Sequence, residues 1–392
     1  MRSGERSWWH MIRFGHSSDW HLTNSKRRMR RNEDGISIRL LDTVDNIHKM
    51  IRFLDHHEAD FLLVCGDIFD STPDEVTREK FAEILGALMW SNLTTIFTIG
   101  QHDIGRRDHF LEAFQYVVDT YPLEFGDITV ADTLSRHTVI SDRGTDVNLI
   151  VQPWDRKIDP RLWRGFMEDG EPNILMGHFG VLGGLLNSSF RSDKGIPPQA
   201  FEPFDYVALG DYHNPDQPFY SGSIARVTFA ERDQRKGFRF VTMTDKGKVK
   251  KIEFVDVHDR PFVQVDATST EGLLDFIKAN EGAAESHAIL KVTVRGTSDE
   301  VSTFARTQEE QFRKDLVEWG VADVIVNYET ENIERETRVE GLEVGVSIDD
   351  AIDAYVEKHP PSDGNLKTME EYKRTARAIV HEVRGSTEGS DG

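Results

Sequence analysis

The chain has 392 residues, of which 38% are hydrophobic, and its 68 acidic and 47 basic side chains give a formal net charge of −21. This length allows two or three domains, each with a buried core. The acidic balance argues against a protein that coats nucleic acid through bulk charge, but it leaves room for a local basic groove. The single cysteine excludes a disulfide framework and a cysteine-based zinc site. Because the sequence shows neither a membrane-length apolar run nor a signal peptide, we expect a soluble, cytoplasmic protein.

The first part of the chain alternates short apolar runs with helical stretches. Strands are predicted at 12–19, 61–67 and 94–100 and in the runs ITVAD, HTVISD, VNLIVQPW, NILMGH and DYVALGD, and helices at 36–57, 74–90 and 107–118. Strands that alternate with helices predict an α/β layered domain, in which helices cover a central sheet or a pair of sheets. In such domains functional residues collect at the carboxyl ends of the strands.

The pattern changes after residue 251. Three strand-like runs, RPFVQVDA, ILKVTVRG and VADVIVNYET, alternate with helices that are expected at 271–279 and 309–319. This β-α-β-α-β order predicts a small α+β domain over residues 251–330, and that domain carries no cluster of His and Asp. The acidic stretch at 331–346 is expected to be a linker.

Two amphipathic helices are expected within residues 347–384, before a tail at 385–392 that we expect to be disordered. The apolar face of the first helix holds Ile348, Ile352, Tyr355 and Val356, and that of the second holds Met369, Tyr372, Ala376, Ile379 and Val383. These faces suit docking on a partner's groove or coiled coil. The alternative is that the two helices fold back on the chain's own core.

Five short segments place polar side chains where an apolar strand gives way to a loop. They are Asp19-Trp20-His21, Gly66-Asp67-Ile68-Phe69-Asp70, Gly100-Gln101-His102-Asp103, Gly177-His178 and Gly210-Asp211-Tyr212-His213. They supply oxygen and imidazole nitrogen but no thiolate, a ligand set that suits Mn²⁺, Mg²⁺ or Fe²⁺. Strand alternation predicts that Asp19 and His21 point to the same side and bind one ion. Each segment is a weak signal alone, but the five in this order indicate a shared metal site.

These segments resemble the calcineurin-like metallophosphoesterase superfamily, whose pattern is DxH, GDxxD, GNH[DE], GH and GHxH. Within it, the runs HSSDWHL, LLVCGDIFD, DYVALGDYH and YSGSIARVTFAE resemble the SbcD-type DNA double-strand-break repair nucleases, which include the meiotic-recombination nucleases. The resemblance covers the N-terminal domain well and the remainder only by its layout. It implies a layered β-sandwich flanked by helices over residues 1–250, a DNA-facing capping domain over 251–330 and a C-terminal helix-loop-helix over 347–384.

The resemblance implies a site for two divalent metal ions, with Mn²⁺ favoured and Mg²⁺ possible. Asp67 would bridge both ions. The other ligands of the first ion would be Asp19, His21 and His213. Those of the second would be Gln101, His178 and Asp211. Two such ions can activate water and stabilise a leaving oxygen in phosphodiester hydrolysis.

The same resemblance implies that His102, oriented by Asp103, stabilises charge at the scissile phosphate and protonates the leaving oxygen. Two positions depart from the family pattern, because Gln101 stands in place of Asn and Asp211 in place of His. Gln keeps a carbonyl oxygen on a longer stem, and Asp211 exchanges a neutral nitrogen for an anionic oxygen, which favours Mn²⁺ or Mg²⁺. We therefore expect an active site with a retuned second metal position.

Other polar residues near these segments have simpler interpretations. His16 is expected to be a packed strand histidine rather than a partner of a metal ligand, and Asp70 to cap a loop or helix start. Cys65 is expected to be inert core. The basic run Lys26, Arg27, Arg28, Arg30 and Arg31 follows the first segment and is expected to contact DNA phosphates, with a solvated loop as the alternative.

The resemblance implies a nuclease subunit that degrades duplex DNA ends 3′→5′ and cuts single strands or hairpins. Its partner would be an SbcC-type, SMC-like coiled-coil ATPase docked on the C-terminal helices, and a homodimer would form through helices of the core. Two other functions remain open, since the metal motifs do not identify the substrate. One is hydrolysis of another phosphoester, and the other is a non-catalytic scaffold that tethers DNA ends.

Overall fold

The computed structural model describes residues 11–24, 30–91, 93–105, 108–112, 114, 127–141, 144–184, 192–267, 272–279, 287–330, 348–358, 368–375 and 377. The chain divides into two compact units, one of residues 1–295 and 300–329 and one of residues 296–299 and 330–392. None of the helices in these described stretches is long and apolar enough to cross a membrane.

Two sheets form the centre of the first unit. The larger has the order β10-β9-β1-β2-β3-β4, with β1 at Met11–Ser17, β2 at Phe61–Cys65, β3 at Thr94–Thr98, β4 at Ile128–Ala131, β9 at Gly237–Thr244 and β10 at Val249–Asp256. The smaller has the order β5-β6-β7-β8, with β5 at Ser135–Ile140, β6 at Asp146–Gln152, β7 at Asn173–His178 and β8 at Tyr206–Gly210. Strands β1 to β4 run parallel, as do β6 to β8. In each sheet, therefore, the carboxyl ends of these strands share one edge.

Strand β2 shows how one apolar run serves two cores. Phe61, Leu63 and Cys65 pack between the two sheets, whereas Leu62 and Val64 face the other way. Side chains alternate along a strand, so a strand that is buried on both faces is apolar throughout. The fully buried FLLVC run follows from this position.

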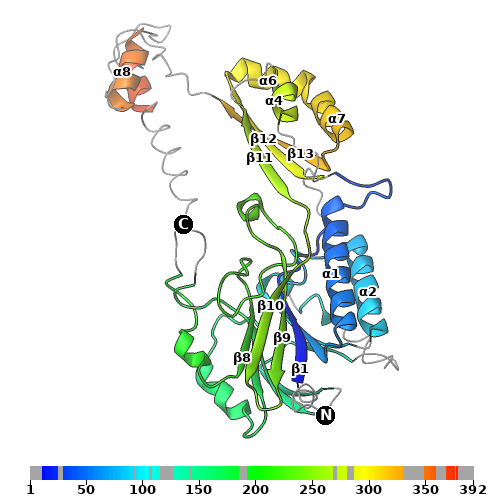
Figure 1. Ribbon diagram of the computed structural model, residues 1–392. Coiled ribbons are helices and arrows are strands. Elements are labelled where there is room, and N and C mark those ends of the chain that lie inside the picture. The colour runs from blue at the N-terminus through cyan, green and yellow to red at the C-terminus, as the bar shows by residue number, and fades with distance from the viewer. Residues whose placement is uncertain are drawn as a thin grey trace. The chain divides into compact units, whose positions relative to one another are not determined.

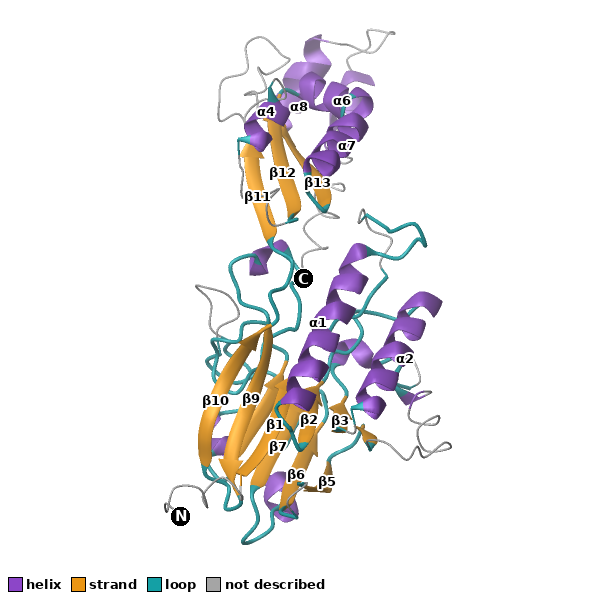
Figure 2. Cartoon of the chain, turned by 45° about the vertical axis from the view of Figure 1, so that its right-hand side comes forward, coloured by secondary structure: helices purple, strands orange, loops and turns teal. Residues whose placement is uncertain are grey.

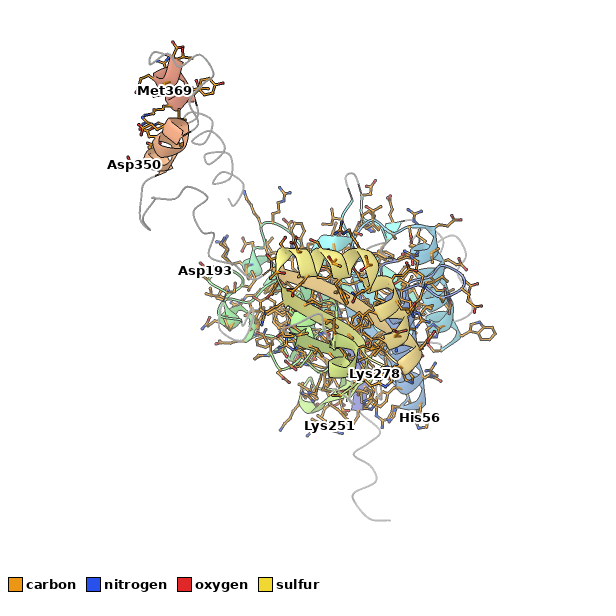
Figure 3. The ribbon with its side chains drawn as sticks, turned by 90° about the horizontal axis from the view of Figure 1, so that it is seen from above. His56, Asp193, Lys251, Lys278, Asp350 and Met369 are labelled. Atoms are coloured by element: carbon orange, nitrogen blue, oxygen red, sulfur yellow. The ribbon has the colours of Figure 1, made fainter. Side chains whose placement is uncertain are left out.

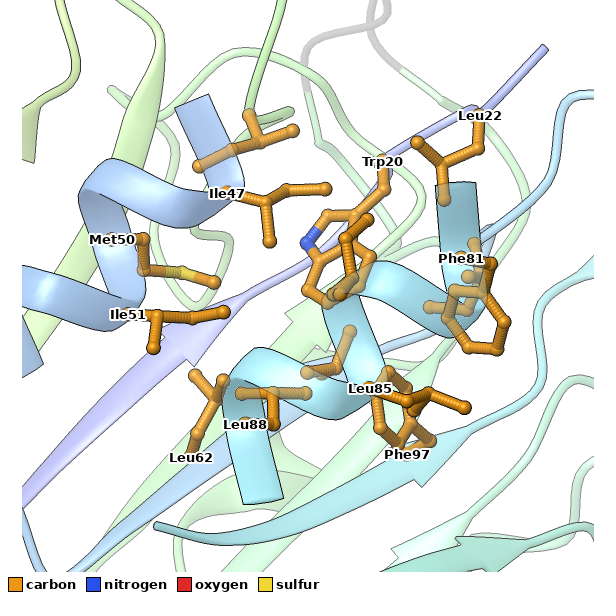
Figure 4. Packing of buried hydrophobic residues seen from close by; sticks show 14 of the residues in the cluster. Trp20, Leu22, Ile47, Met50, Ile51, Leu62, Phe81, Leu85, Leu88 and Phe97 are labelled. Carbon is orange, nitrogen blue, oxygen red and sulfur yellow. The ribbon is translucent and has the colours of Figure 1, made fainter. Parts of the chain in front are cut away.

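Helices α1 (Ile38–His56) and α2 (Glu75–Trp90) lie side by side over the outer face of the larger sheet (Figure 2). Figure 4 shows Ile47, Met50 and Ile51 of α1 and Phe81, Leu85 and Leu88 of α2 around Leu62, Phe97 and Trp20. Asp74 caps α2, since its carboxylate accepts a hydrogen bond from the Thr77 backbone at 2.9 Å. Half of the helix expected at 107–118 lies outside the described residues.

The outer face of the smaller sheet is covered by the 3₁₀ helices η3 (Pro160–Phe166) and η4 (Pro198–Phe201). Trp163 is buried there and stacks on Phe179 and Phe201. The layers are thus helices, sheet, sheet and helices. The predicted α/β fold, a layered pair of sheets flanked by helices, is confirmed.

A three-stranded sheet follows, in the order β11 (Phe262–Ala267), β12 (Ile289–Gly296) and β13 (Asp323–Thr330). Figure 1 shows helices α4 (Leu273–Lys278), α6 (Ser298–Thr307) and α7 (Glu309–Trp319) against this sheet. Apolar residues of the three helices form one buried cluster with those of the strands. Helix α6 is additional to the expected β-α-β-α-β order. The expected domain boundary at residue 250 falls inside β10, which pairs with β9 in the larger sheet.

In the second unit, α8 (Ile348–Lys358) lies beside a helical segment at 368–375, as Figure 3 shows at Asp350 and Met369. Lys373 Nζ lies 2.7 Å from Glu357 Oε1, and Arg377 forms a second ion pair with Asp353. Of the predicted apolar faces, Ile352 and Met369 are half-buried and Tyr372 is exposed. The side chains of Ile348 and Tyr355, together with Ile379, the linker and the tail, lie outside the described residues.

Candidate metal centre

The five predicted segments meet where the two sheets present the carboxyl ends of their strands. Asp19 follows β1, Asp67 follows β2, and the 3₁₀ helix η2 (Gln101–Asp103) follows β3. From the smaller sheet, His178 ends β7 and Asp211 follows β8. The Nε2 atom of His178 lies 3.4 Å from Asp67 Oδ2, so side chains of the two sheets meet at this edge.

One cluster consists of Asp19, His21 and His213, whose ligand atoms lie close enough together to hold one metal ion. The Nε2 atoms of His21 and His213 face each other at 3.1 Å. His213 Nε2 is also 3.8 Å from Asp19 Oδ1, and His21 Nε2 is 3.8 Å from Asp67 Oδ2. Two imidazole nitrogens and carboxylate oxygens that converge on one point are typical of a divalent-metal site.

A second cluster joins Asp19, Asp67 and His178. The Nδ1 atom of His178 donates to the Cys65 carbonyl oxygen at 2.8 Å, which directs Nε2 at Asp67 Oδ2. That Nε2 is fully buried and makes no hydrogen bond to the described residues. A buried polar atom without a hydrogen bond is costly unless a cation lies between it and the facing carboxylate, so the donors at this position fit a metal ion.

The electrostatics of the site also favour a bound cation. Burial tends to raise the pKa of Asp67, but the facing His178 and His21 outweigh it and hold that pKa well below its usual range. Burial and the nearby carboxylates of Asp19 and Asp67 raise the pKa of Asp211. Like charges that crowd in a buried site disfavour one another's ionised forms. Positive charge placed among these carboxylates relieves that repulsion.

Several candidate ligands have a positive φ, in the left-handed region that residues other than glycine rarely adopt. Asp19, His21, Asp67 and Asp211 have φ angles of 52°, 45°, 51° and 110°. The expectation that strand alternation aligns Asp19 with His21 is therefore wrong, because β1 ends at Ser17 and the following turn directs both side chains. Such backbone strain concentrates at functional sites, where the surrounding structure enforces it.

Gly100 permits the close approach of two of these loops. A Cβ atom at this position would lie 2.2 Å from Asp67 Oδ1 and 2.4 Å from the Asp67 backbone nitrogen. Any side chain here would displace the carboxylate at the middle of the site.

The two positions that depart from the family pattern lie together. Gln101 Nε2 is 3.5 Å from Asp211 Oδ1, and the Asp211 backbone donates to Asp19 Oδ1 at 3.2 Å. The side chain of Gln101 is exposed, and it can rotate to present its carbonyl oxygen instead of its amide nitrogen.

His102 lies beside the clusters, but its ring is oriented by the Asp70 carbonyl oxygen and not, as the sequence predicted, by the Asp103 carboxylate. Its Nδ1 donates to the Asp70 carbonyl oxygen at 2.7 Å, and its backbone donates to Asp67 Oδ1 at 2.9 Å. Asp103 is buried and accepts hydrogen bonds from the backbones of Gly100 and Phe69, both at 2.9 Å. The tight η2 turn directs the Asp103 carboxylate back onto the loops, where burial raises its pKa to about 6. Asp103 therefore fixes the two loops and does not hold the His102 ring.

Asp70 also differs from its prediction, because Asp74 and not Asp70 caps the next helix. The Asp70 carboxylate lies 3.5 Å from His21 Nδ1, and this imidazole lowers the pKa of Asp70. His16, as predicted, is a packed strand histidine. Its ring nitrogens pair with the Tyr206 hydroxyl and the Leu209 carbonyl, and burial lowers its pKa to about 3.

Sequence reasoning missed Glu231 and Lys236. Glu231 Oε1 accepts a hydrogen bond from His213 Nδ1 at 3.1 Å, and Lys236 Nζ lies 2.7 Å from Glu231 Oε2. In the sequence these residues stand in the polar stretch AERDQRKGF, which looks like a solvated loop. Only their burial distinguishes them from surface charges.

The basic run is partly described. Arg30 Nη1 donates to the Ala322 carbonyl oxygen at 3.2 Å, and the Arg30 backbone donates to Asp323 Oδ2 at 2.7 Å. Arg31 donates to the Asn24 carbonyl oxygen at 2.9 Å. These two arginines therefore hold the loop to β13 and to itself, whereas Lys26, Arg27 and Arg28 lie outside the described residues.

The comparison with known families accounts for this arrangement. A family model of calcineurin-like phosphoesterases matches residues 12–215, which is more than half of the 392 residues. The chain belongs to the calcineurin-like phosphoesterase family. This family uses divalent metals, and the chain is accordingly a metal-dependent phosphoester hydrolase whose His and Asp clusters are its candidate metal ligands. The matched region includes every predicted ligand from Asp19 to His213, but it ends before Glu231 and Lys236.

Proposed function

We propose that this calcineurin-like phosphoesterase is the DNA nuclease subunit of an SbcD-type double-strand-break repair complex, and that it hydrolyses DNA phosphodiesters at a site for two Mn²⁺ or Mg²⁺ ions. The observation that carries the hydrolytic part is the position of Asp67. One of its carboxylate oxygens lies 3.4 Å from His178 Nε2 and 3.8 Å from His21 Nε2, so the same side chain faces both clusters.

The division of the ligands between the two ions follows the family pattern. Asp67 would be shared, with Asp19, His21 and His213 holding the first ion and Gln101, His178 and Asp211 the second. When bound, such a pair of ions supplies Lewis-acid stabilisation of the phosphate oxygens and activates the attacking water. The residues of the chain contribute the fixed positions of these ligands, since the carbonyl of Cys65 and the loops around Gly100 restrain them.

His102 is suited to act as the general acid. Its ring is exposed and lies 5.1 Å from the His21 ring, measured between ring centroids. Because Nδ1 donates to the Asp70 carbonyl, Nε2 is the atom that can carry a proton to the leaving oxygen. Its backbone bond to Asp67 fixes its distance from the shared carboxylate.

DNA is proposed as the substrate because of the basic loop at residues 26–31, which follows Asp19 and His21 in the sequence. Clustered cations of this kind bind phosphate backbones in a salt-dependent manner. The depression where this loop meets β13 does not add to that support, because Glu318 and Asp323 line it together with Arg30, Arg313 and Lys314. If the slope of log K against log salt is unchanged after Arg27 and Arg28 are replaced by Ala, the basic loop does not contact DNA.

The decisive test incubates the full chain and Mn²⁺ with labelled duplex, single-stranded and hairpin DNA, and separately with p-nitrophenyl phosphate. We expect cleavage of DNA, shortening of duplexes from their 3′ ends, and loss of all cleavage when EDTA removes the metal. Hydrolysis of the monoester with intact DNA would instead identify another phosphoesterase. DNA binding without cleavage of any substrate would identify a tethering scaffold.

We also propose that the C-terminal helical pair docks on an SMC-like coiled-coil ATPase. The ion pairs Lys373–Glu357 and Arg377–Asp353 hold the two helices together, while Tyr372 remains 58% exposed. Removal of residues 346–392 is expected to abolish co-purification with such an ATPase and to spare Mn²⁺-dependent DNA cleavage. Loss of cleavage and association together would show that these helices support the chain's own core.

A further inference from the structure

Residues 220–236 pack around His213 although they lie beyond the matched family region. The His213 carbonyl oxygen accepts hydrogen bonds from the Ser223 backbone and from Lys236 Nζ, both at 3.2 Å. Its Nδ1 pairs with Glu231 Oε1 at 3.1 Å. Residues 220–236 thus fix both the backbone and the ring of His213.

The Glu231–Lys236 pair is buried and fully hydrogen-bonded. Glu231 is 6% exposed and Lys236 only 1%. Lys236 Nζ donates to Glu231 Oε2 and to Ser223 Oγ, both at 2.7 Å, and the Val227 backbone donates to Glu231 Oε2 at 3.0 Å. Burying two charges costs desolvation energy that an apolar pair would avoid, so stability alone does not explain their presence.

The same segment supports the neighbouring ligand. Ser221 Oγ lies 2.8 Å from Ser18 Oγ, and Ser18 Oγ donates to Asp19 Oδ2 at 2.5 Å. Asp19 and His213 belong to the same candidate metal cluster. In contrast, His178 of the other cluster is held by a neutral carbonyl, that of Cys65.

We propose that Glu231, held by Lys236, is a positioning residue for His213 and so sets the affinity of the first metal position. This inference rests on the two-ion site of the proposed function. A carboxylate that accepts from Nδ1–H fixes the tautomer, directs Nε2 at the metal and makes that nitrogen more basic. Since His178 has only a carbonyl behind it, the first position is expected to bind its ion more tightly than the second.

The test is a titration of the full chain with Mn²⁺, followed by calorimetry, for the wild type, Glu231→Gln, Glu231→Leu and Lys236→Met. We expect Glu231→Leu to weaken the tighter of two Mn²⁺ equivalents by about 10- to 100-fold, as is usual when such a partner is removed. Glu231→Gln keeps an oxygen acceptor in nearly the same shape and should lose less. Because this variant is nearly isosteric, it serves if the Leu variant fails to fold.

Asp60→Asn is the matched control. Asp60 is a buried carboxylate directly before β2 that accepts a hydrogen bond from the Arg13 backbone at 2.7 Å, at the opposite end of this strand from Asp67. It should lower thermal stability but leave both Mn²⁺ affinities unchanged. The proposal is overturned if folded Glu231 variants bind both ions as the wild type does, or if Asp60→Asn weakens binding equally. A wild type that binds no Mn²⁺ overturns the two-ion site as well, whereas Mn²⁺ binding without DNA cleavage rejects only the nuclease.

Discussion

Asp67→Asn is expected to lower DNA hydrolysis by about 10³-fold or more and to remove at least one of two bound Mn²⁺ ions. The Asp67 carboxylate faces His178 at 3.4 Å and His21 at 3.8 Å, so it is the ligand that both proposed ions share. An amide has no net charge and only one oxygen, and the loss of several kcal/mol of metal-mediated stabilisation corresponds to this change in rate. Calorimetric Mn²⁺ titration and a gel-based cleavage assay measure the two effects.

The control for this variant is Asp159→Asn. Asp159 is an acidic residue at the start of η3, where its side chain accepts from the Arg161 backbone, and it has no part in the site. Its activity should match that of the wild type. Asp67→Asn itself should remain folded, because the amide has nearly the size of the carboxylate and keeps an oxygen that can accept the hydrogen bond from the His102 backbone. If the folded Asp67 variant keeps both Mn²⁺ ions and its cleavage rate, the site has been assigned incorrectly.

His102→Gln is expected to slow DNA cleavage by about 10²- to 10⁴-fold, the usual contribution of general acid catalysis, while both Mn²⁺ ions remain bound. The reason lies in the leaving group. A DNA strand leaves as an alkoxide, which needs a proton, whereas p-nitrophenolate leaves readily without one. The loss should therefore be much smaller on bis(p-nitrophenyl) phosphate than on DNA.

The comparison of the two substrates separates the possible roles of His102. Equal losses on both esters, accompanied by weaker Mn²⁺ binding, would make His102 a metal ligand rather than an acid. The structure gives a reason to test for this outcome, since His102, His21 and Asp70 form a third group of potential metal ligands. Asp103→Asn should resemble a folding defect, because both oxygens of Asp103 bind backbone of the loops.

The sequence indicated the fold and the general location of the site because both depend on local pattern. The run FLLVC predicts a strand buried on both faces, and polar residues directly after such strands predict a shared edge. His178 and Asp67 meet across two sheets for this reason. The parts that were not predictable depend on three-dimensional packing instead.

Three residues illustrate this limit. The predicted role of Asp103, to orient the neighbouring His102, was wrong because a tight 3₁₀ turn directs the Asp103 carboxylate to backbone amides. The position of Asp103 next to His102 in the sequence does not reveal this direction. Asp19 was expected to follow the alternation of a strand, but its left-handed φ places it in a turn instead. Glu231 was missed because a sequence does not distinguish a buried glutamate from a solvated one. Its partner His213 also lies on another loop, 18 positions earlier.

The most direct test of the central claim, that Asp67 is shared by two metal ions, is anomalous diffraction from crystals of the full chain soaked in Mn²⁺. We expect two anomalous peaks, both within bonding distance of the Asp67 carboxylate, one beside His21 and His213 and the other beside His178. A single peak, or peaks that the Asp67 carboxylate does not contact, would contradict it.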